Sequence, residues 1–310
     1  MGTGTTAAGR DELWDLAAAR VLAARGWSLR RLERLGRPRD VRRTWLAEGA
    51  PGTVVVKAVA SRFARERAAW VAEALALLRA RGCPAPALLW QGPLDGDWWL
   101  SVQERRPGRP LRGMDRATLD RLLALVELQA DPGLPPGGWD VSWWTGVVLF
   151  EGWEHWWDGT HAAAPATAAR LRAFLEPAWG HRLPTADLVH GDLGLDNVLA
   201  DGGVISGVVD WDDVGLGSRA IDLAGLLFDW HRLRLAGGRA LAPDGGERLV
   251  RGIAAVAGEV GLRCSVAYAA VERLGLAALR GERDGAETWR RVTDAILDEL
   301  QEARAAPQER

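Results

Sequence analysis

Two neighbouring segments, residues 188–199 and 204–213, carry acidic and amide side chains at a spacing suited to phosphate chemistry. Asp192 is followed five residues later by Asn197, and Asp210 closes the next apolar run. Mg²⁺ prefers carboxylate and amide oxygens together with phosphate oxygens and water. Phosphoryl transfer needs such a cation and a carboxylate that accepts or orients the proton of the attacking hydroxyl. The spacing therefore predicts phosphoryl transfer from ATP or GTP, with Asp192 as the base and Asn197 and Asp210 as Mg²⁺ ligands.

The single lysine is a second candidate for phosphate binding. Lys57 is the only lysine among 39 basic residues, and it follows the β-branched run Thr53–Val56. That run predicts a strand over residues 53–60. An ammonium group is a compact point charge that the planar guanidinium of arginine does not replace. A specific role for Lys57 is therefore expected, in preference to that of an exposed strand residue.

The fragment His190-Gly191-Asp192, followed by Asn197, resembles the catalytic loop of the aminoglycoside phosphotransferase family, and residues 210–213 resemble its metal-binding segment. The resemblance extends over about residues 27–303. It implies an α+β, protein-kinase-like fold with two lobes. The N-lobe would contain a small antiparallel sheet and one long helix, and the C-lobe would be larger and mainly helical.

The resemblance also implies a nucleotide site. Lys57 would contact the α- and β-phosphates and pair with a carboxylate of the long helix. Glu73 is the preferred partner, because Glu66 follows the lysine too closely for the chain to turn and return. The carbonyl of Gln103 and the amide of Arg105 would contact adenine. A phosphate-covering glycine pattern is lacking, since only Gly36 lies between the first two expected strands.

Periodicity and turn residues predict the elements that position these groups. In the first third of the chain we expect helices over residues 11–25 and 62–81, strands over 27–35, 43–47 and 53–60, and a hairpin over 87–103. The rest is mainly helical. Helices are expected over residues 115–130, 166–175, 221–233, 246–260, 265–280 and 287–303, and short strands near 188, over 197–200 and over 204–210.

The Pro/Gly-containing stretch Glu104–Pro110 is the best candidate for a linker. We therefore expect a disordered tail over residues 1–10, a nucleotide-binding N-lobe over 11–105, and a C-lobe over 106–310 that carries the catalytic loop, the metal site and the acceptor site. Asp222 is expected to cap the helix that begins near it and, as the resemblance implies, also to brace the catalytic loop.

The acceptor is expected to be a small molecule. Gly191 stands where protein kinases usually have the arginine that couples the loop to a phosphorylated segment, and only eleven residues separate Asp210 from Asp222. Six of the 17 tryptophans form a cluster whose role, in the core or as an acceptor wall, stays open; they are Trp139, Trp143, Trp144, Trp153, Trp156 and Trp157. Several nearby acids could attract an amine: Asp140, Glu151, Glu154, Asp158, Asp212, Asp213 and Asp229.

Some positions depart from the family pattern and leave the acceptor undetermined. Gly194 and Gln129 stand where histidine is frequent, and Ser218-Arg219 replaces a common Asp-Pro. The acceptor could be an aminoglycoside or other antibiotic, which would make this a resistance enzyme. Alternatives are a metabolite kinase for an amino alcohol or sugar, and a nucleotide-binding module without turnover. The complete set of base and metal ligands argues against the module.

Composition describes an ordinary protein, with 48% apolar residues and a formal charge of −2. Neither nucleic acid nor a membrane is expected as a partner, and oligomeric state is left open. Cys83 and Cys264 lie far apart without metal-ligand spacing, which favours a reducing compartment. Since no signal peptide or membrane span is apparent, a cytoplasmic location is expected.

Overall fold

The computed structural model describes residues 7–35, 42–60, 64–95, 98–131, 133, 139–151, 154–238 and 240–305. The chain forms two compact units, the first made of residues 1–107 and 206–209 and the second of residues 108–205 and 210–310. Each unit is described by itself. The predicted tail lies outside the described residues over 1–6. Residues 7–10 are helical, so the first helix begins before its expected start at Asp11; Ala7 and Ala8, with the high helix propensity of alanine, extend it.

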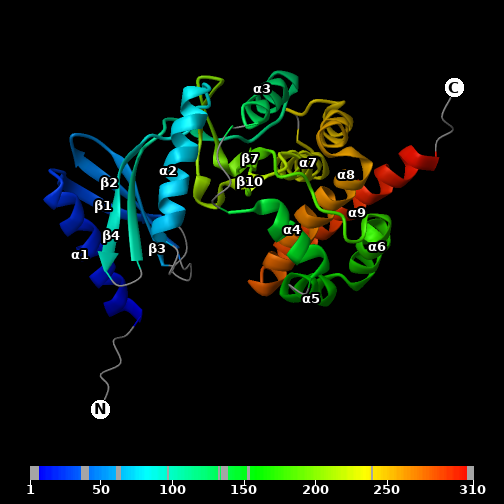
Figure 1. Ribbon diagram of the computed structural model, residues 1–310, viewed down its shortest axis with the longest axis horizontal. Coiled ribbons are helices and arrows are strands. Elements are labelled where there is room, and N and C mark those ends of the chain that lie inside the picture. Colours follow the sequence, from blue (N-terminus) through cyan, green and yellow to red (C-terminus); the bar gives the residue numbers. More distant parts are fainter. Residues whose placement is uncertain are drawn as a thin grey trace, which may run out of the picture. The chain divides into compact units, whose positions relative to one another are not determined.

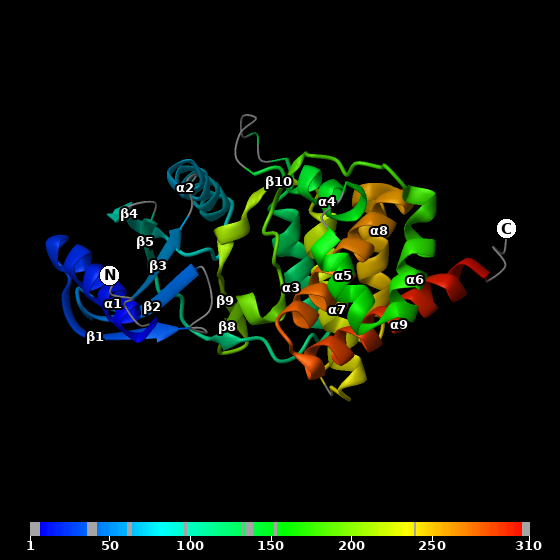
Figure 2. The same cartoon turned by 90° about the horizontal axis from the view of Figure 1, so that it is seen from below.

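The first unit is built on a five-stranded antiparallel sheet (Figures 1 and 2). The strand order is β1-β2-β3-β5-β4, and hydrogen bonds join each strand to its neighbours. The strands are β1 (Ser28–Leu35), β2 (Arg42–Ala50), β3 (Val54–Ala60), β4 (Leu88–Asp95) and β5 (Trp98–Glu104). This sheet matches the predicted meander and hairpin, although the turn at residues 96–97 and the loop containing Gly36 lie outside the described residues.

Helices α1 (Ala7–Ala24) and α2 (Ala64–Ala80) lie on opposite faces of this sheet (Figures 1 and 2). On β3, Val54, Val56 and Ala58 pack into one buried cluster with Ala18 and Leu22 of α1. Successive side chains of a strand point to opposite faces. Lys57 therefore projects from the face opposite α1.

The second unit is mainly helical, as predicted. Its helices are α3 (Arg116–Glu127), α4 (Val141–Phe150), α5 (Glu154–Ala163), α6 (Pro165–Leu175), α7 (Ala220–Leu235), α8 (Gly245–Leu279) and α9 (Arg283–Ala305). Helix α7 is the core of this unit, because every residue from Ala220 to His231 is buried. It packs against α3, α8 and α9. A helix that is buried on all sides is a rigid support for whatever lies at its ends.

Short strands bring the two predicted site segments together. Strand β7 (Asp187–Val189) pairs with β10 (Gly215–Gly217), so that Val189 lies opposite Gly215. The predicted catalytic loop, residues 190–197, follows β7, and the predicted metal-binding segment, residues 210–213, precedes β10. A second sheet, of order β6-β8-β9, contains β6 (Arg109–Pro110), β8 (Val198–Asp201) and β9 (Val204–Val208). Residues 190–197 and 210–214 are therefore held side by side between paired strands.

Helix α8 contains two helical segments, as predicted over residues 246–260 and 265–280, but the break between them lies at a different residue. The two form one element interrupted only at Gly258, whose φ of 70° and ψ of 178° are not helical. Glycine adopts positive φ without steric cost, so the break falls there and not at the predicted gap. Within the described part of the chain, α8 alone is long and apolar enough to cross a membrane, but more than half of its apolar stretch is buried against the protein.

Candidate active site

The catalytic loop begins with a turn that requires glycine. Gly191 has a φ of 84°, and a Cβ atom built on it would lie 3.0 Å from the carbonyl oxygen of Asp213. Both the backbone conformation and the close approach exclude a side chain. The backbone of residues 210–213 therefore lies where a side chain at position 191 would begin.

Asp222 braces this turn. Its buried carboxylate accepts the backbone N–H of His190 at 2.7 Å and that of Gly191 at 3.1 Å, and it also accepts the side-chain amide of Gln129 at 3.0 Å. Of the two roles considered from the sequence, bracing is confirmed and capping is wrong. Helix α7 begins at Ala220, so Asp222 lies inside its first turn, and the carboxylate points to the loop.

The side chains of Asn197 and Asp192 contact each other across the loop. The Asn197 amide nitrogen donates to the Asp192 backbone carbonyl at 2.9 Å and lies 3.4 Å from its Oδ2. With the nitrogen engaged in this way, Oδ1 is the acceptor end of the Asn197 side chain. A neutral amide oxygen of this kind is a suitable ligand for a hard cation.

Asp210 is the anionic Mg²⁺ ligand predicted from the sequence. It lies on the short loop before the one-turn helix Trp211–Asp213, in the left-handed conformation with φ 66° and ψ 46°. Aspartate tolerates this region better than most residues, and a non-glycine residue held there is typical of functional sites. Trp211 is buried with its ring centroid 4.4 Å from that of His190, which fixes the segment against the catalytic loop.

Three carboxylates converge at this point. The Asp192 side chain reaches solvent, yet the surrounding protein removes enough water to raise the pKa of its carboxyl, and the negative charges of Asp210 and Asp213 raise it further. Arg273 and His190 act in the opposite direction. A divalent cation would relieve this repulsion. The donor set therefore fits Mg²⁺.

The protein would supply only some of the Mg²⁺ ligands, and phosphate oxygens and water would supply the others. Across the described ranges, no three His, Cys, Asp or Glu side chains are arranged to enclose a metal. Mg²⁺ is commonly held by one or two carboxylates and otherwise by phosphate oxygens and water. Asn197 and Asp210 would supply the protein part of such a shell.

The residues expected to bind nucleotide all lie in the first unit. Lys57 is buried on β3, with Thr44 and Ser101 opposite it on the neighbouring strands. Glu66 and Glu73 are both exposed on α2. Pairing of Lys57 with Glu73 stays a prediction.

Gln103 and Arg105 flank a carboxylate that was not singled out from the sequence. Gln103 is buried near the end of β5, and Arg105 is exposed just after it. Between them, Glu104 accepts the Ala87 N–H at 3.0 Å and pairs with Arg79 at 3.2 Å and Arg106 at 3.0 Å. Burial acts to raise the pKa of Glu104, but these hydrogen bonds and charges lower it overall. This network fixes the backbone around Glu104. Contacts of adenine with the Gln103 carbonyl and the Arg105 amide stay a prediction.

Helix α8 contributes residues that no motif indicated. Glu272 lies within electrostatic reach of Asp192, Asp213 and Asp222, and its carboxylate accepts a 3.3 Å hydrogen bond from Arg273. Burial and these acids raise the pKa of Glu272 to about 8. Contact between α8 and a loop some 80 residues earlier depends on tertiary packing, so the local sequence gives no signal.

The tryptophan cluster divides between core and surface. Trp157 is buried, and its indole donates to the Val148 carbonyl at 3.0 Å. Trp139, Trp144 and Trp156 are partly exposed and form a row, with ring centroids 5.5 Å apart for the first pair and 6.2 Å for the second. Tyr268 of α8 extends the row, 6.2 Å from Trp156. Trp153 lies outside the described residues.

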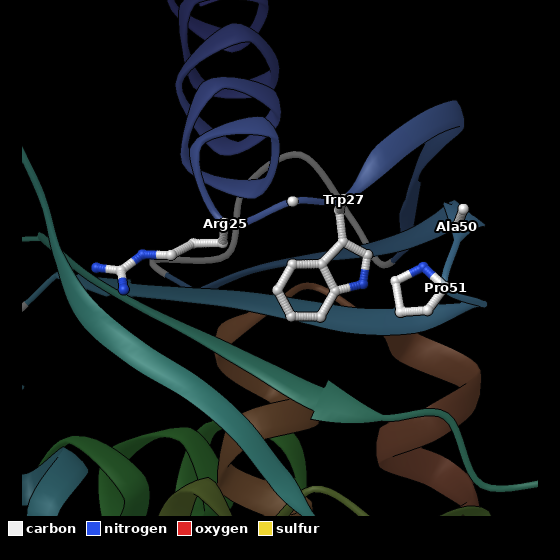
Figure 3. A pocket seen from close by; sticks show the side chains of 5 residues that line it. Arg25, Trp27, Ala50 and Pro51 are labelled. Atoms are coloured by element: carbon white, nitrogen blue, oxygen red, sulfur yellow. The ribbon is translucent and has the colours of Figure 1, made fainter.

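A hollow of ≈ 380 Å³ in the first unit is unrelated to these residues (Figure 3). It is lined by Arg25, Gly26, Trp27, Ala50 and Pro51, and the Arg25 side chain extends away from Trp27 and Pro51. The Arg25 guanidinium lies over the Trp90 ring at 4.7 Å. No predicted site residue borders this hollow.

A model of the phosphotransferase enzyme family (APH) matches residues 31–259, which is most of the chain. The chain belongs to this family. The matched region contains every residue predicted for the site, from Lys57 to Asp210, whereas Glu272 and Arg273 lie beyond it.

Relatives of this phosphotransferase-family chain include two curated kinases. It is 48% identical over 82 residues to viomycin phosphotransferase of Streptomyces vinaceus, covering 24% of this chain and 28% of that protein. It is 36% identical over 154 residues to homoserine kinase of Methylobacterium sp. (strain 4-46), covering 48% of this chain and 43% of that protein. The matches thus span less than half the length of either relative.

The fold is that of the kinase-like phosphotransferases. The structure of a thermostable mutant of aminoglycoside phosphotransferase APH(4)-Ia, in a ternary complex with ADP and hygromycin B, matches with a TM-score of 0.63. The match covers 91% of this chain and 97% of that one, at 20% sequence identity. The predicted fold class is confirmed.

Proposed function

We propose that this chain transfers the γ-phosphoryl group of ATP to a hydroxyl of a small molecule. The observation that carries the proposal is the convergence of Asp192, Asn197, Asp210 and Asp213 within one unit, which matches the needs of phosphoryl transfer. Nucleotides are bound by the related structure that contains ADP. Lys57, Glu73, Gln103 and Arg105 are the proposed nucleotide-binding residues.

In the proposed reaction, the acceptor oxygen forms a bond to the γ-phosphorus as the bond between that phosphorus and the ADP oxygen breaks. Asp192 accepts the proton of the hydroxyl, and ADP is the leaving group. Bound Mg²⁺ would neutralise charge on the phosphates and the leaving group. Asp222 keeps Asp192 in place by holding the preceding turn.

We propose that the acceptor is an amine-bearing antibiotic, which carries both an amine and the hydroxyl that receives the phosphoryl group. The partly exposed row of Trp139, Trp144 and Trp156 can hold an organic cation or stack on a sugar ring. The negative charge of Asp213 lies within electrostatic reach of Tyr268, at the end of this row. Viomycin phosphotransferase, among the relatives, supports an antibiotic acceptor.

A second candidate is a metabolite kinase that acts on an amino alcohol. The match to homoserine kinase, over 154 residues, supports it. Both candidates require the same catalytic groups, so the acceptor alone distinguishes them. A module without turnover is disfavoured, because it has no need for a base and metal ligands together.

The test is to incubate the protein with Mg²⁺ and either ATP or GTP in the presence of aminoglycosides, viomycin, other hydroxylated antibiotics, homoserine and amino alcohols. Mass spectrometry should detect the addition of one phosphoryl group to at least one compound, and excess EDTA should abolish it. Binding of nucleotide without any phosphorylated product across the panel would refute the proposal and favour the binding module.

A further inference from the structure

Asp229 reaches the catalytic loop from α7, two turns after Asp222. The seven-residue separation places both acids on the same face of the helix. Asp229 is 5% exposed, and its Oδ2 accepts the backbone N–H of Leu195 at 2.7 Å. Leu195 begins the one-turn helix that ends at Asn197. The two acids on α7 therefore hold the loop on both sides of Asp192.

Gly194 lies beside this contact, and its backbone does not explain why it is glycine. Its φ of −147° and ψ of 168° are extended values that any residue adopts. A Cβ atom at this position would first meet Oδ2 of Asp229, at 3.0 Å. A side chain at position 194 would therefore press on the oxygen that accepts the Leu195 N–H.

We propose that Asp229 is a positioning residue, which fixes the Leu195–Asn197 turn and with it the Asn197 oxygen, and that Gly194 is glycine to leave room for its carboxylate. The proposal rests on the function proposed above. It differs from the sequence-based suggestion that Asp229 attracts an acceptor amine, because the carboxylate is buried and already bound to the loop.

Arg232 also binds the Asp229 carboxylate, so a residue with a single acceptor oxygen cannot replace Asp229 without losing one partner. Its Nε donates to Asp229 Oδ1 at 2.9 Å, and its Nη2 lies 2.8 Å from the same oxygen. Asparagine offers one acceptor oxygen, so it can receive either the Leu195 N–H or the arginine. If the oxygen faces Leu195, the amide nitrogen confronts the Arg232 donors. Removing the arginine would relieve this conflict.

The test therefore compares Asp229→Asn, Arg232→Met and the double variant. Asp229→Asn should lower kcat by about 10- to 100-fold, as loss of a group that orients a metal ligand commonly does. The KM for the acceptor should change little, because the turn does not bind it. The double variant should recover most of the loss, since the asparagine oxygen can then accept the Leu195 N–H.

Hydrogen exchange gives a readout that needs no acceptor. Amides of residues 188–199 should exchange faster in Asp229→Asn than in wild type, and the double variant should restore their protection. Gly194→Ala, which keeps the charges of Asp229 and Arg232, should accelerate hydrogen exchange of the same amides and lower kcat. Asp120→Asn is the matched control, because Asp120 lies on α3 outside the loop and is 54% exposed in its pair with Arg248; it should leave both readouts unchanged.

Unchanged exchange and unchanged kcat in folded Asp229→Asn would overturn the proposal. So would a double variant as impaired as the single one, which would indicate a general loss of packing. If Asp229→Asn does not fold, Gly194→Ala decides by the same two measurements. If the wild type phosphorylates no acceptor, the proposed function fails, but the exchange comparison still tests whether Asp229 fixes the turn.

Discussion

The Asp222 carboxylate accepts the backbone N–H of His190 at 2.7 Å, from a position that is only 1% exposed. A core helix thus holds the first turn of the predicted catalytic loop through a carboxylate that accepts three N–H donors. Burial raises the pKa of this carboxyl, and the donors act in the opposite direction. The geometry of Asp192 depends on a residue 30 positions later in the chain.

Asp222→Asn should therefore cost both stability and turnover. An asparagine has one acceptor oxygen for three donors, from His190, Gly191 and Gln129. A buried donor left unsatisfied costs about 1–3 kcal/mol, which urea unfolding can measure. Asp120→Asn is the control, since Asp120 is 54% exposed in its pair with Arg248, and such pairs contribute about 0–1 kcal/mol. Equal losses in the two variants would contradict the bracing role.

Gly191→Ala tests whether the turn must be free of a side chain. The left-handed conformation alone should cost about 1–2 kcal/mol, and the contact with the Asp213 carbonyl should also displace the metal-binding segment. Gly203→Ala separates the two effects, because Gly203 has a φ of 80° and nothing within 4 Å of its Cβ position. Both variants should lower Tm, but only Gly191→Ala should lower turnover per folded molecule. Similar turnover in both would show that the close approach is unimportant.

Glu272 predicts a pH dependence of stability. Its pKa is raised from 4.5 to about 8, first by burial, so between these values the folded protein holds a proton that the unfolded chain has released. Stability is therefore lost as pH rises through this window and then levels off. Glutamine cannot ionise, so Glu272→Gln should not lose stability in this way. The Tm of the variant minus the Tm of wild type should therefore increase from pH 5 to pH 8. A constant difference would mean that Glu272 titrates normally.

Trp144→Ala tests the aromatic row as the acceptor wall. Loss of a cation–π contact worth about 1 kcal/mol should raise the KM for an amine-bearing acceptor by about 5-fold. The KM for ATP should not change. Trp143→Ala is the control on the same helix, because Trp143 is 46% exposed and takes no part in the row. If both variants behave alike, the row belongs to the core and the acceptor binds elsewhere.

The sequence predicted the features that local rules determine. These features are local in the sequence. They are the five-residue spacing of Asp192 and Asn197, the strand that carries Lys57, and the periodic helices. The antiparallel sheet and the helical second unit were predicted for the same reason. Asp222 was recognised as a brace only by resemblance, since its contact is with a loop 30 residues earlier.

The missed features depend on tertiary packing. Glu272 and Arg273 reach the site because α8 packs against α7, and no motif marks them. The role of Gly194 becomes visible only when the Asp229 carboxylate is seen beside it. The break in α8 falls at Gly258, which has a positive φ. Helix α8 contains several glycines, and the local sequence does not indicate which of them breaks the helix.

The assignment of Asp192 as the base is tested most directly by the kcat of Asp192→Asn, measured together with its nucleotide affinity and with Asp120→Asn as the control. Asparagine keeps the size of the side chain but cannot accept the hydroxyl proton. Turnover should fall by about two to four orders of magnitude while ATP affinity stays nearly unchanged, and Asp120→Asn should resemble wild type. Full turnover in Asp192→Asn, or loss of its ATP binding, would contradict the assignment of Asp192 as the base.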